Sequence, residues 1–329
     1  MITAAIAGLG RWGQNLVTSA NPATLRFTTA HTRTRQTADA FCHAHGLRWT
    51  GDFEGILRDP AIQAVVLATP HRSHADQVRR AAAAGKHVFV EKPFALSVAD
   101  ADLMIQAAAD VGIVLAVGFN RRFHPSMRHL RRLTRDGGLG TIVSVSAEQT
   151  ALHGLDLTPD AWRAQPEEAP GGAMTAIGVH LVDGMIDLLG PITAVTARVT
   201  RRAAVHADDT TNVLLSFENG ATGLLFCSTA STPTYRMAVH GTEGMAEILG
   251  HPMAVLRHSA ALLGENRHTA EPAIFEVSGI NMLTAELDAF AAAITGDVPF
   301  PTPLSEIRHG VVVFAAILRS AEIGQTVSI

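Results

Sequence analysis

Cysteine, lysine and tyrosine are scarce in this chain of 329 residues, and the scarcity of cysteine and of tyrosine each excludes a class of protein. Only Cys42 and Cys227 are present, so neither a disulfide framework nor a cysteine-rich zinc site is expected. Lysine occurs only at Lys86 and Lys92, and every other basic side chain is arginine. Tyrosine occurs only at Tyr235, and valine follows it four positions later, which excludes the Tyr-x-x-x-Lys pair of short-chain dehydrogenases.

Long apolar runs and an excess of one charge are also missing. There are 30 acidic and 26 basic residues, a net charge of −4 with histidine neutral, so we expect neither nucleic acid nor an acidic membrane as a partner. No apolar run approaches the ~20 residues of a membrane-spanning helix. The first residues lack the pattern of a signal peptide, which predicts a cytoplasmic protein. With 47% apolar and 17% charged residues, the chain is expected to fold into about two globular domains.

Short apolar runs alternate with helical patterns through the first third of the chain. The runs at residues 3–7, 25–30, 64–68, 87–90 and 113–117 are rich in β-branched or small apolar residues. Such strands, separated by helices, predict a doubly wound parallel sheet covered on both faces, that is, a Rossmann domain. The alternation ends near residues 118–122, so this domain is predicted to span residues 1–120.

The remaining residues, 121–329, are predicted to form an α+β domain. Five strands follow one another between residues 194 and 249, and Asn219-Gly220 is a typical hairpin turn between two of them. Successive strands without intervening helices predict an open, mainly antiparallel sheet. Helices are expected at residues 125–135, 176–189, 283–294 and 305–321. The arginines between residues 121 and 135 are interpreted as a solvated helix face.

A glycine-rich loop follows the first predicted strand and opens the first helix. Gly8 allows the tight turn, Gly10 lets the backbone approach a diphosphate, and Gly13 packs the helix on the strand. The N-terminus of that helix then offers free N–H groups and a partial positive charge to the phosphates. With Arg11 and Trp12 between the glycines, the loop predicts a dinucleotide site. An ordinary glycine-rich turn is the alternative.

The end of the second strand carries no acid. An NAD site usually places a carboxylate about 20 residues after the glycine loop, on the adenosine ribose. Residues 30–35 instead include Thr32, which can bind a 2′-phosphate through hydrogen bonds, and Arg33, which can neutralise it. The sequence therefore predicts NADP, with NAD as the other cofactor considered. The alternative is that these side chains are merely solvated.

One of the two lysines follows the predicted strand at residues 87–90. Ligands of open α/β sheets bind beyond the carboxyl ends of the strands. Lys92, within Glu91-Lys92-Pro93, is therefore expected at the cofactor crevice, where an ammonium can exchange protons and a guanidinium cannot. The alternative is a surface lysine.

These segments together resemble the Gfo/Idh/MocA oxidoreductases over nearly the whole chain. The resemblance lies in residues 8–13, 68–74, 84–93, 118–123, 162–163, 171–172 and 178–180. It implies a nicotinamide cofactor in the first domain, and a sugar, polyol or related substrate against the sheet of the second. It also implies homodimers or homotetramers that pair through that sheet.

The resemblance also assigns roles to individual residues. Lys92 is expected to contact the substrate oxygen and the nicotinamide ribose, and His180 to donate or accept the proton. Positioned acid–base help of this kind is typically worth ~10²–10⁴ in rate. The expected substrate contacts are Lys92, Arg163, His180 and Asp183. The expected cofactor contacts are Gly8, Gly10, Arg11, Trp12, Gly13, Thr32, Arg33, Thr69, Pro70, His74, Glu91, Lys92 and Asn120.

The chain departs from the family pattern four residues before His180. Many family dehydrogenases have aspartate there, and this chain has Ala176. Asp183 could lie on the same helix face. The departure puts polyol oxidation in doubt, leaves room for a reductase or a different proton relay, and permits a non-catalytic NADP sensor. A glycoside hydrolase that uses bound NAD in a redox cycle is a separate alternative within the same family. No metal site is expected, since no further ligands cluster with His71 and His74.

Overall fold

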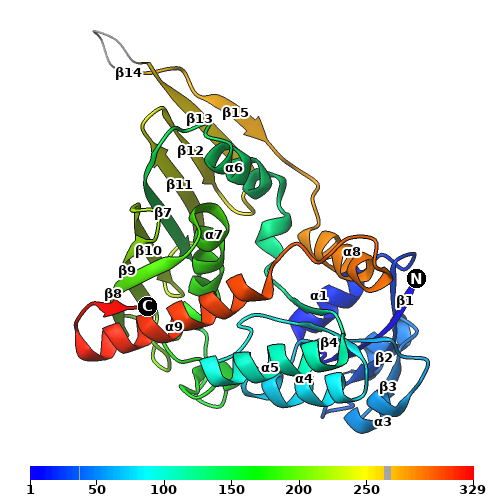
Figure 1. The fold of residues 1–329 in the computed structure, drawn as a ribbon. Coiled ribbons are helices and arrows are strands. Elements are labelled where there is room, and N and C mark those ends of the chain that lie inside the picture. Colours follow the sequence, from blue (N-terminus) through cyan, green and yellow to red (C-terminus); the bar gives the residue numbers. More distant parts are fainter. Residues whose placement is uncertain (37, 263–267) are drawn as a thin grey trace. The chain divides into compact units, whose positions relative to one another are not determined.

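The computed structural model describes residues 1–36, 38–262 and 268–329 (Figure 1). The chain divides into two compact units. Unit 1 contains Met1–Asn120 and Asn281–Arg308, and unit 2 contains Arg121–Ile280 and His309–Ile329. The expected boundary after residue 120 coincides with the end of the first segment. Residues 281–308, which the sequence analysis placed in the second domain, belong to unit 1 instead.

A six-stranded parallel sheet lies at the centre of unit 1. Its strand order is β3-β2-β1-β4-β5-β6, that of the Rossmann fold, which confirms the predicted doubly wound sheet. Only β3 was not expected, because its residues form no apolar run and are exposed or half-buried, whereas the equally short β6 is apolar and buried. The strands are β1 (Ile2–Ala7), β2 (Leu25–His31), β3 (Arg48–Thr50), β4 (Ala64–Leu67), β5 (His87–Val90) and β6 (Leu115–Val117).

Helices cover both faces of this sheet (Figure 1). Helices α4 (His74–Ala83) and α5 (Val98–Val111) pack together on one face. On the other, α1 (Arg11–Ser19) packs against α8 (Met282–Thr295), which comes from the far end of the chain. The buried side chains of Ile6, Val66 and Phe89 form a core with Leu287 and Phe290 of α8. Two short helices, α2 (Asp39–Ala44) and α3 (Phe53–Arg58), complete the unit.

A ten-stranded, mainly antiparallel sheet lies at the centre of unit 2, as predicted. Its order is β14-β13-β12-β11-β7-β10-β9-β8-β16, and β15 pairs with β13. Strands β7 and β10 are parallel neighbours. The strands are β7 (Ile142–Thr150), β8 (Ile192–Thr200), β9 (Thr210–Phe217), β10 (Thr222–Ser228), β11 (Thr234–Gly241), β12 (Gly244–Leu249), β13 (Val255–Leu262), β14 (His268–Thr269), β15 (Ala273–Glu276) and β16 (Val327–Ser328).

Helices α6 (Pro125–Arg135) and α7 (Val179–Leu189) pack together, and both contact this sheet. Every residue of α7 is buried. The predicted helix at residues 176–189 begins instead with a π-helical turn over Met174–Gly178. Helix α9 (Leu304–Ile323) contributes residues to both units. Within the described ranges, no helix combines the length and the apolar character needed to cross a bilayer.

Candidate functional site

The glycine loop of unit 1 has two positions that exclude any side chain. Gly8 has φ of +92°, and a Cβ there would lie 2.3 Å from the carbonyl oxygen of Ala68. A Cβ on Gly13 would lie 1.9 Å from the carbonyl oxygen of Gly8. Gly10 differs, because it is exposed and a Cβ there would meet no atom within 4 Å. Backbone atoms therefore fill the space beside Gly8 and Gly13, whereas the space beside Gly10 is unoccupied. This unoccupied space is called the opening above Gly10.

Gly10 is also the N-cap of α1, and no side chain there accepts a hydrogen bond from the helix. The first turn of α1 contains no acidic residue. Its N–H groups and the positive end of its dipole thus face open space, as an anion site requires. The residues fit the diphosphate of a dinucleotide. Arg11 is exposed and Trp12 half-buried beside this opening.

The segment after β2 carries an arginine before its first acid. Thr32 is half-buried and Arg33 is exposed. The first carboxylate after the strand is Asp39, and the guanidinium of Arg35 is paired with it at 3.1 Å. Arg35 also lies over the ring of Trp49, with its Cζ 5.2 Å from the ring centroid. A negative phosphate beyond β2 would therefore meet no unpaired carboxylate in this segment.

The two lysines have different environments. Lys86 is buried, and its Nζ donates to the carbonyl oxygens of Asp59 and Ile62, both at 2.7 Å. Burial lowers the pKa of this ammonium. Its contacts hold a backbone turn, which is a structural role. Lys92 is half-buried immediately beyond β5, at the carboxyl edge of the sheet where ligands of such folds bind.

His74 connects the loops that follow β4 and β5. It is completely buried, with Nε2 3.2 Å from the carbonyl oxygen of Thr69 and Nδ1 3.1 Å from that of Pro93. Burial lowers its pKa. The ring thus positions the residues beside Lys92, and its expected contact with a cofactor stays a prediction. Thr69 and Pro70 are themselves half-buried at this edge.

Glu91 points into the interior of unit 1. Its side chain is buried, and Oε2 accepts from the backbone N–H of Lys92 at 3.2 Å. A Cβ on Gly118 would lie 2.8 Å from Oε1, so the backbone after β6 closes over the carboxyl group. Burial raises the pKa of Glu91 to about 7, although the indole of Trp12 and the charge of Lys92 act against it. These contacts lie inside the unit, and the expected cofactor contact of Glu91 stays a prediction.

His180 and Asp183 lie on α7 in unit 2, and both are buried. Arg122 binds both oxygens of Asp183, at distances between 2.7 and 3.0 Å. It also reaches Asp187 at 3.2 Å. The interpretation of this arginine as part of a solvated face was wrong. The two partners of Arg122, Asp183 and Asp187, lie about one helical turn apart on α7. This spacing in the sequence could have suggested that the two aspartates share one cation.

A second arginine of unit 2, half-buried Arg121, was also missed. The guanidinium of Arg121 lies over the ring of Tyr235, with Cζ 5.1 Å from the centroid. Burial lowers the pKa of Arg121 and raises that of Tyr235 to about 12. Arg163, by contrast, is exposed and stacks on Trp162 at 4.0 Å. Because Arg121 and Arg122 are adjacent in a run rich in arginine, the local sequence gives no sign of which side chain is buried.

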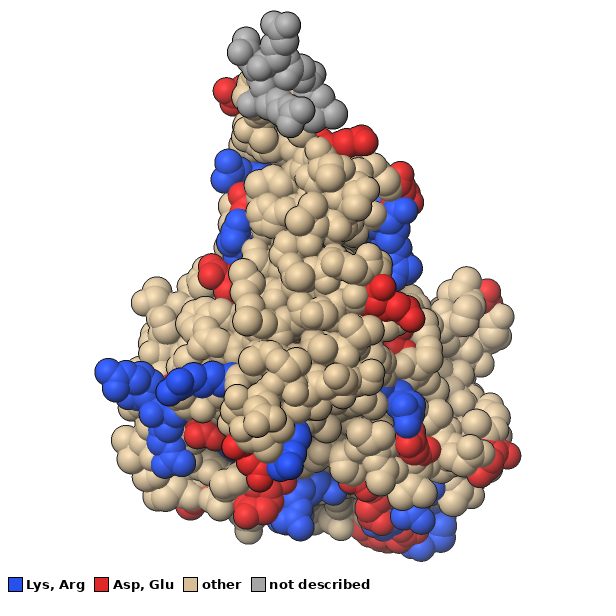
Figure 2. All heavy atoms as spheres, turned by 60° about the vertical axis from the view of Figure 1, so that its left-hand side comes forward, with Lys and Arg blue, Asp and Glu red and all other residues tan. Residues whose placement is uncertain are grey.

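The remaining expected residues bring no metal ligands together. Asn120 is buried where the first segment of unit 1 ends. The rings of His71 and His74 lie 5.9 Å apart. Among residues 1–36, 38–262 and 268–329, no three histidine, cysteine, aspartate or glutamate side chains gather as metal ligands would. Figure 2 shows acidic and basic side chains interspersed on the face that it displays, in line with the small net charge.

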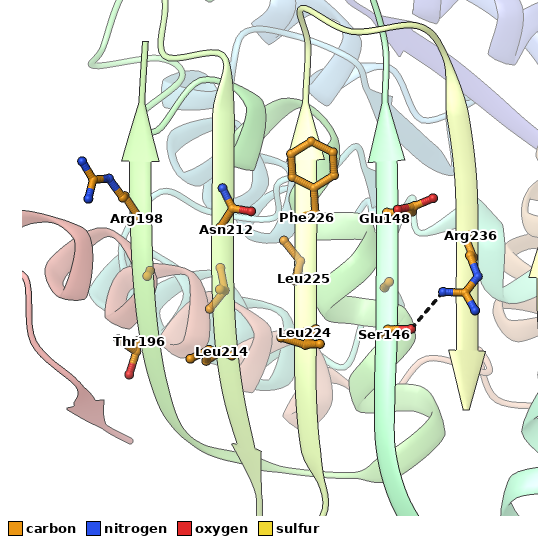
Figure 3. A pocket seen from close by; sticks show the side chains of 13 residues that line it. Ser146, Glu148, Thr196, Arg198, Asn212, Leu214, Leu224, Leu225, Phe226 and Arg236 are labelled. Atoms are coloured by element: carbon orange, nitrogen blue, oxygen red, sulfur yellow. Dashed lines mark hydrogen bonds between the residues drawn. The ribbon is translucent and has the colours of Figure 1, made fainter. Parts of the chain in front are cut away.

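A shallow hollow of about 480 Å³ lies on the face of the unit 2 sheet opposite α7 (Figure 3). Its floor is apolar, with Leu214 and Leu224 at 57% and 53% exposure. Arg236 donates to Ser146 at its edge. The sheet itself separates this hollow from His180. Other residues that line it are Glu148, Thr196, Arg198, Asn212, Leu225 and Phe226.

Two sequence models of known families match this chain. Residues 2–119 match the oxidoreductase family with an NAD-binding Rossmann fold, and residues 127–247 match the GFO/IDH/MocA C-terminal domain. Levoglucosan dehydrogenase of Pseudarthrobacter phenanthrenivorans is 29% identical over 223 residues, 59% of this chain and 57% of the relative. Trans-1,2-dihydrobenzene-1,2-diol dehydrogenase of Mus musculus is 30% identical, over 60% of this chain and 58% of the relative. The match thus spans less than two thirds of these relatives.

Solved structures share the fold over the whole chain. Levoglucosan dehydrogenase in complex with NADH superposes with a TM-score of 0.89 at 23% identity, covering 100% of this chain and 99% of the other. The aldose-aldose oxidoreductase of Caulobacter crescentus superposes with a TM-score of 0.84 at 27% identity, over 100% and 99%. The first of these similarities, below 25% identity, bears on the fold alone.

Proposed function

Because the chain belongs to the GFO/IDH/MocA family of oxidoreductases, we propose that it transfers a hydride between a nicotinamide dinucleotide and a carbon–oxygen group of a sugar, diol or related compound. One observation carries the proposal. The opening above Gly10 faces the N-terminus of α1, and a half-buried lysine lies at the carboxyl edge of the same sheet. A diphosphate cradle and a proton-exchanging ammonium are what such an oxidoreductase needs in this unit.

The substrate class rests on the relatives. A diol and an aldose are named among the proteins similar to this chain. Both compounds carry hydroxyl groups, which an ammonium and an imidazole can bind and deprotonate. We propose that exposed Arg163 contacts the substrate. For Asp183 we propose a positioning role, because Arg122 already holds both of its carboxylate oxygens.

When bound, the dinucleotide supplies the donor or acceptor of the hydride. The backbone around Gly10 would hold the diphosphate, with Arg11 and Trp12 beside it. Lys92 would stabilise negative charge on the substrate oxygen, and His180 would exchange its proton. We propose these roles from the family resemblance and from the place of each residue in its own unit.

NADP is the proposed cofactor. Arg33 is exposed beyond β2, and the nearest following carboxylate, Asp39, is held by Arg35. We expect purified protein to bind NADP(H) more tightly than NAD(H) in a fluorescence titration. Arg33→Glu should reverse the order by repelling the 2′-phosphate. Arg58→Glu, on a surface helix, is the matched control and should leave the order unchanged. Tighter binding of NAD(H) by the unaltered protein would contradict this prediction.

A panel of sugars and diols, each assayed with both cofactors, tests the activity. The change in cofactor absorbance measures turnover. Lys92→Met and His180→Ala should each lower kcat by roughly 10²–10⁴ while cofactor binding is retained. The exposed residue His43 provides the control His43→Ala, which should keep full activity.

The outcomes separate the three classes of function. Substrate turnover without net change in the cofactor would indicate the glycoside hydrolase, and binding without turnover would indicate the sensor. If Lys92 and His180 act on the same oxygen, the double variant should lose little more than either single variant. Full activity of both single variants would remove the two residues from the mechanism.

A further inference from the structure

Two buried glutamates of unit 1, Glu91 and Glu286, lie close enough for the charge of Glu91 to act on Glu286. Phe89 and Glu91 are two residues apart along β5 and its extension, so their side chains point to the same face. Glu286 and Phe290 are four residues apart on α8, which is about one helical turn. The rings of Phe89 and Phe290 pack with centroids 5.7 Å apart. Glu91 lies two residues beyond Phe89 along the strand, and Glu286 lies about one turn before Phe290 along the helix. The packing of the two rings therefore brings Glu286 close to Glu91.

Both carboxyl groups of this pair are shielded from water. Glu286 has no exposed surface, and neither of its carboxyl oxygens has a hydrogen-bond partner among the described residues. Glu91 is 5% exposed, and its Oε2 accepts from the N–H of Lys92. The charged groups that act on the pair are the two carboxyls themselves and Lys92. Two buried carboxylates with a single ammonium beside them would repel each other at a large cost in free energy.

We propose that Glu286 retains a proton and donates it in a hydrogen bond to Glu91, and that this pair positions Lys92 and sets its electrostatic environment. The proton stays between one Glu286 oxygen and one Glu91 oxygen, so the pair carries one negative charge when Glu91 is ionised. The second oxygen of Glu91 fixes the peptide N–H of Lys92. The part that concerns Lys92 rests on the proposed function.

The electrostatics of the two groups support this arrangement. Burial, and then the charge of Glu91, raise the pKa of Glu286 well above its usual range. Burial raises the pKa of Glu91 to about 7. Interacting carboxyls lose their protons in two steps that belong to the pair. The first step therefore falls near neutrality, and the second follows at higher pH.

Infrared difference spectroscopy of the whole protein tests the pair without turnover. At about pH 8.5, above the first step, the unaltered protein should keep the carbonyl band of one buried, protonated carboxyl group. Glu286→Gln should abolish this band at that pH, and the change is nearly isosteric. The control Asp102→Asn, an exposed carboxylate paired with Arg308, should leave the band intact. A band that is absent from the unaltered protein, or unchanged in Glu286→Gln, overturns the proposal.

A second variant, Glu91→Gln, tests the link to Lys92. The pH profile of kcat/KM should show a step near 7 that is lost in Glu91→Gln and retained in Asp102→Asn. A purely structural role would lower Tm but leave the profile unchanged, and that result overturns the link. If no substrate or cofactor pair turns over at all, the proposed function fails, whereas the infrared band still decides the carboxyl pair. If Glu286→Gln does not fold, the Glu91→Gln spectra decide the assignment: the carbonyl band at about pH 8.5 should persist because it belongs to Glu286, and its absence overturns the proposal.

Discussion

Arg122 holds the largest buried charge cluster described in unit 2. Its guanidinium contacts Asp183 and Asp187, and all three side chains are 6% exposed. Desolvation makes such a pair a weak source of net stability, but the loss of one partner leaves a buried charge without compensation. The arginine is therefore needed once the aspartates are present. It also fixes the helix that carries His180.

Arg122→Met is expected to lower the free energy of unfolding by about 3–5 kcal/mol, because Asp183 and Asp187 lose their buried cation. Urea denaturation followed by circular dichroism measures the change. Arg131→Met is the matched control, since Arg131 also contacts Asp187 but is 44% exposed. Its cost should stay below about 1 kcal/mol. Equal losses in the two variants would argue against a special role for the buried arginine.

Individual residues show how far sequence reasoning could go in the candidate site. Lys92 was predicted from its place after a strand, and the structure puts it at the carboxyl edge of the sheet. The inward direction of Glu91 was not predicted, because it depends on Gly118 and α8, which are distant in sequence. The burial of His74 depends in the same way on the next loop. His180 was identified through the family resemblance, and no local pattern links it to Lys92.

In the glycine loop, the folding requirement at Gly13 is separate from the binding role proposed for Gly10. Gly13 is closed off by the backbone of Gly8, whereas Gly10 faces open space. Gly10 caps the N-terminus of the helix that contains Gly13, so one substitution at each position can test the two roles separately.

Gly13→Ala should lower the free energy of unfolding by roughly 1–3 kcal/mol, since its Cβ would force backbone apart. Gly10→Ala should leave Tm nearly unchanged but weaken dinucleotide binding roughly tenfold or more, because its Cβ would occupy the space above the helix N-terminus. Thermal unfolding and a cofactor titration measure the two effects. A Gly10→Ala protein that binds the dinucleotide with full affinity would disprove the cradle.

Long, regular elements were predicted well, and short or non-local ones were not. The strands of the parallel sheet and helices such as α1, α5 and α6 match their expected positions because their apolar periodicity is strong. Strands β3, β14 and β16 were missed because they have only two or three residues and form no apolar run, and β15 because it is exposed. Strand β13 is longer but carries little apolar periodicity. Helix α8 was predicted as a helix, but nothing in its pattern indicates which sheet it covers.

The uncovered face of the unit 2 sheet bears on assembly. We propose that a second copy of the chain covers it, as the family resemblance implies. The exposed leucines Leu214 and Leu224 lie there between arginine and glutamate side chains, which can pair across a two-fold interface.

Leu214→Glu should convert the oligomer to a monomer, because a charge would be buried at the centre of the apolar floor. Light scattering coupled to size-exclusion chromatography measures the mass. Leu103→Glu, on α5 of unit 1, replaces an equally exposed leucine and should not change the mass. A monomeric unaltered protein, or an oligomer unaffected by Leu214→Glu, would show that another surface is used.

Unit 1 is built from two segments of the chain, and this has a consequence for biosynthesis. Leu287, Phe290 and Ala291 of α8 cover an apolar face of a sheet whose strands all come from the first 120 residues. A ribosome adds ~5–20 residues per second, so that face waits roughly ten to thirty seconds for its cover. During that interval the nascent sheet is a target for chaperones and a nucleus for aggregation, and a chain terminated before residue 281 would stay in that condition.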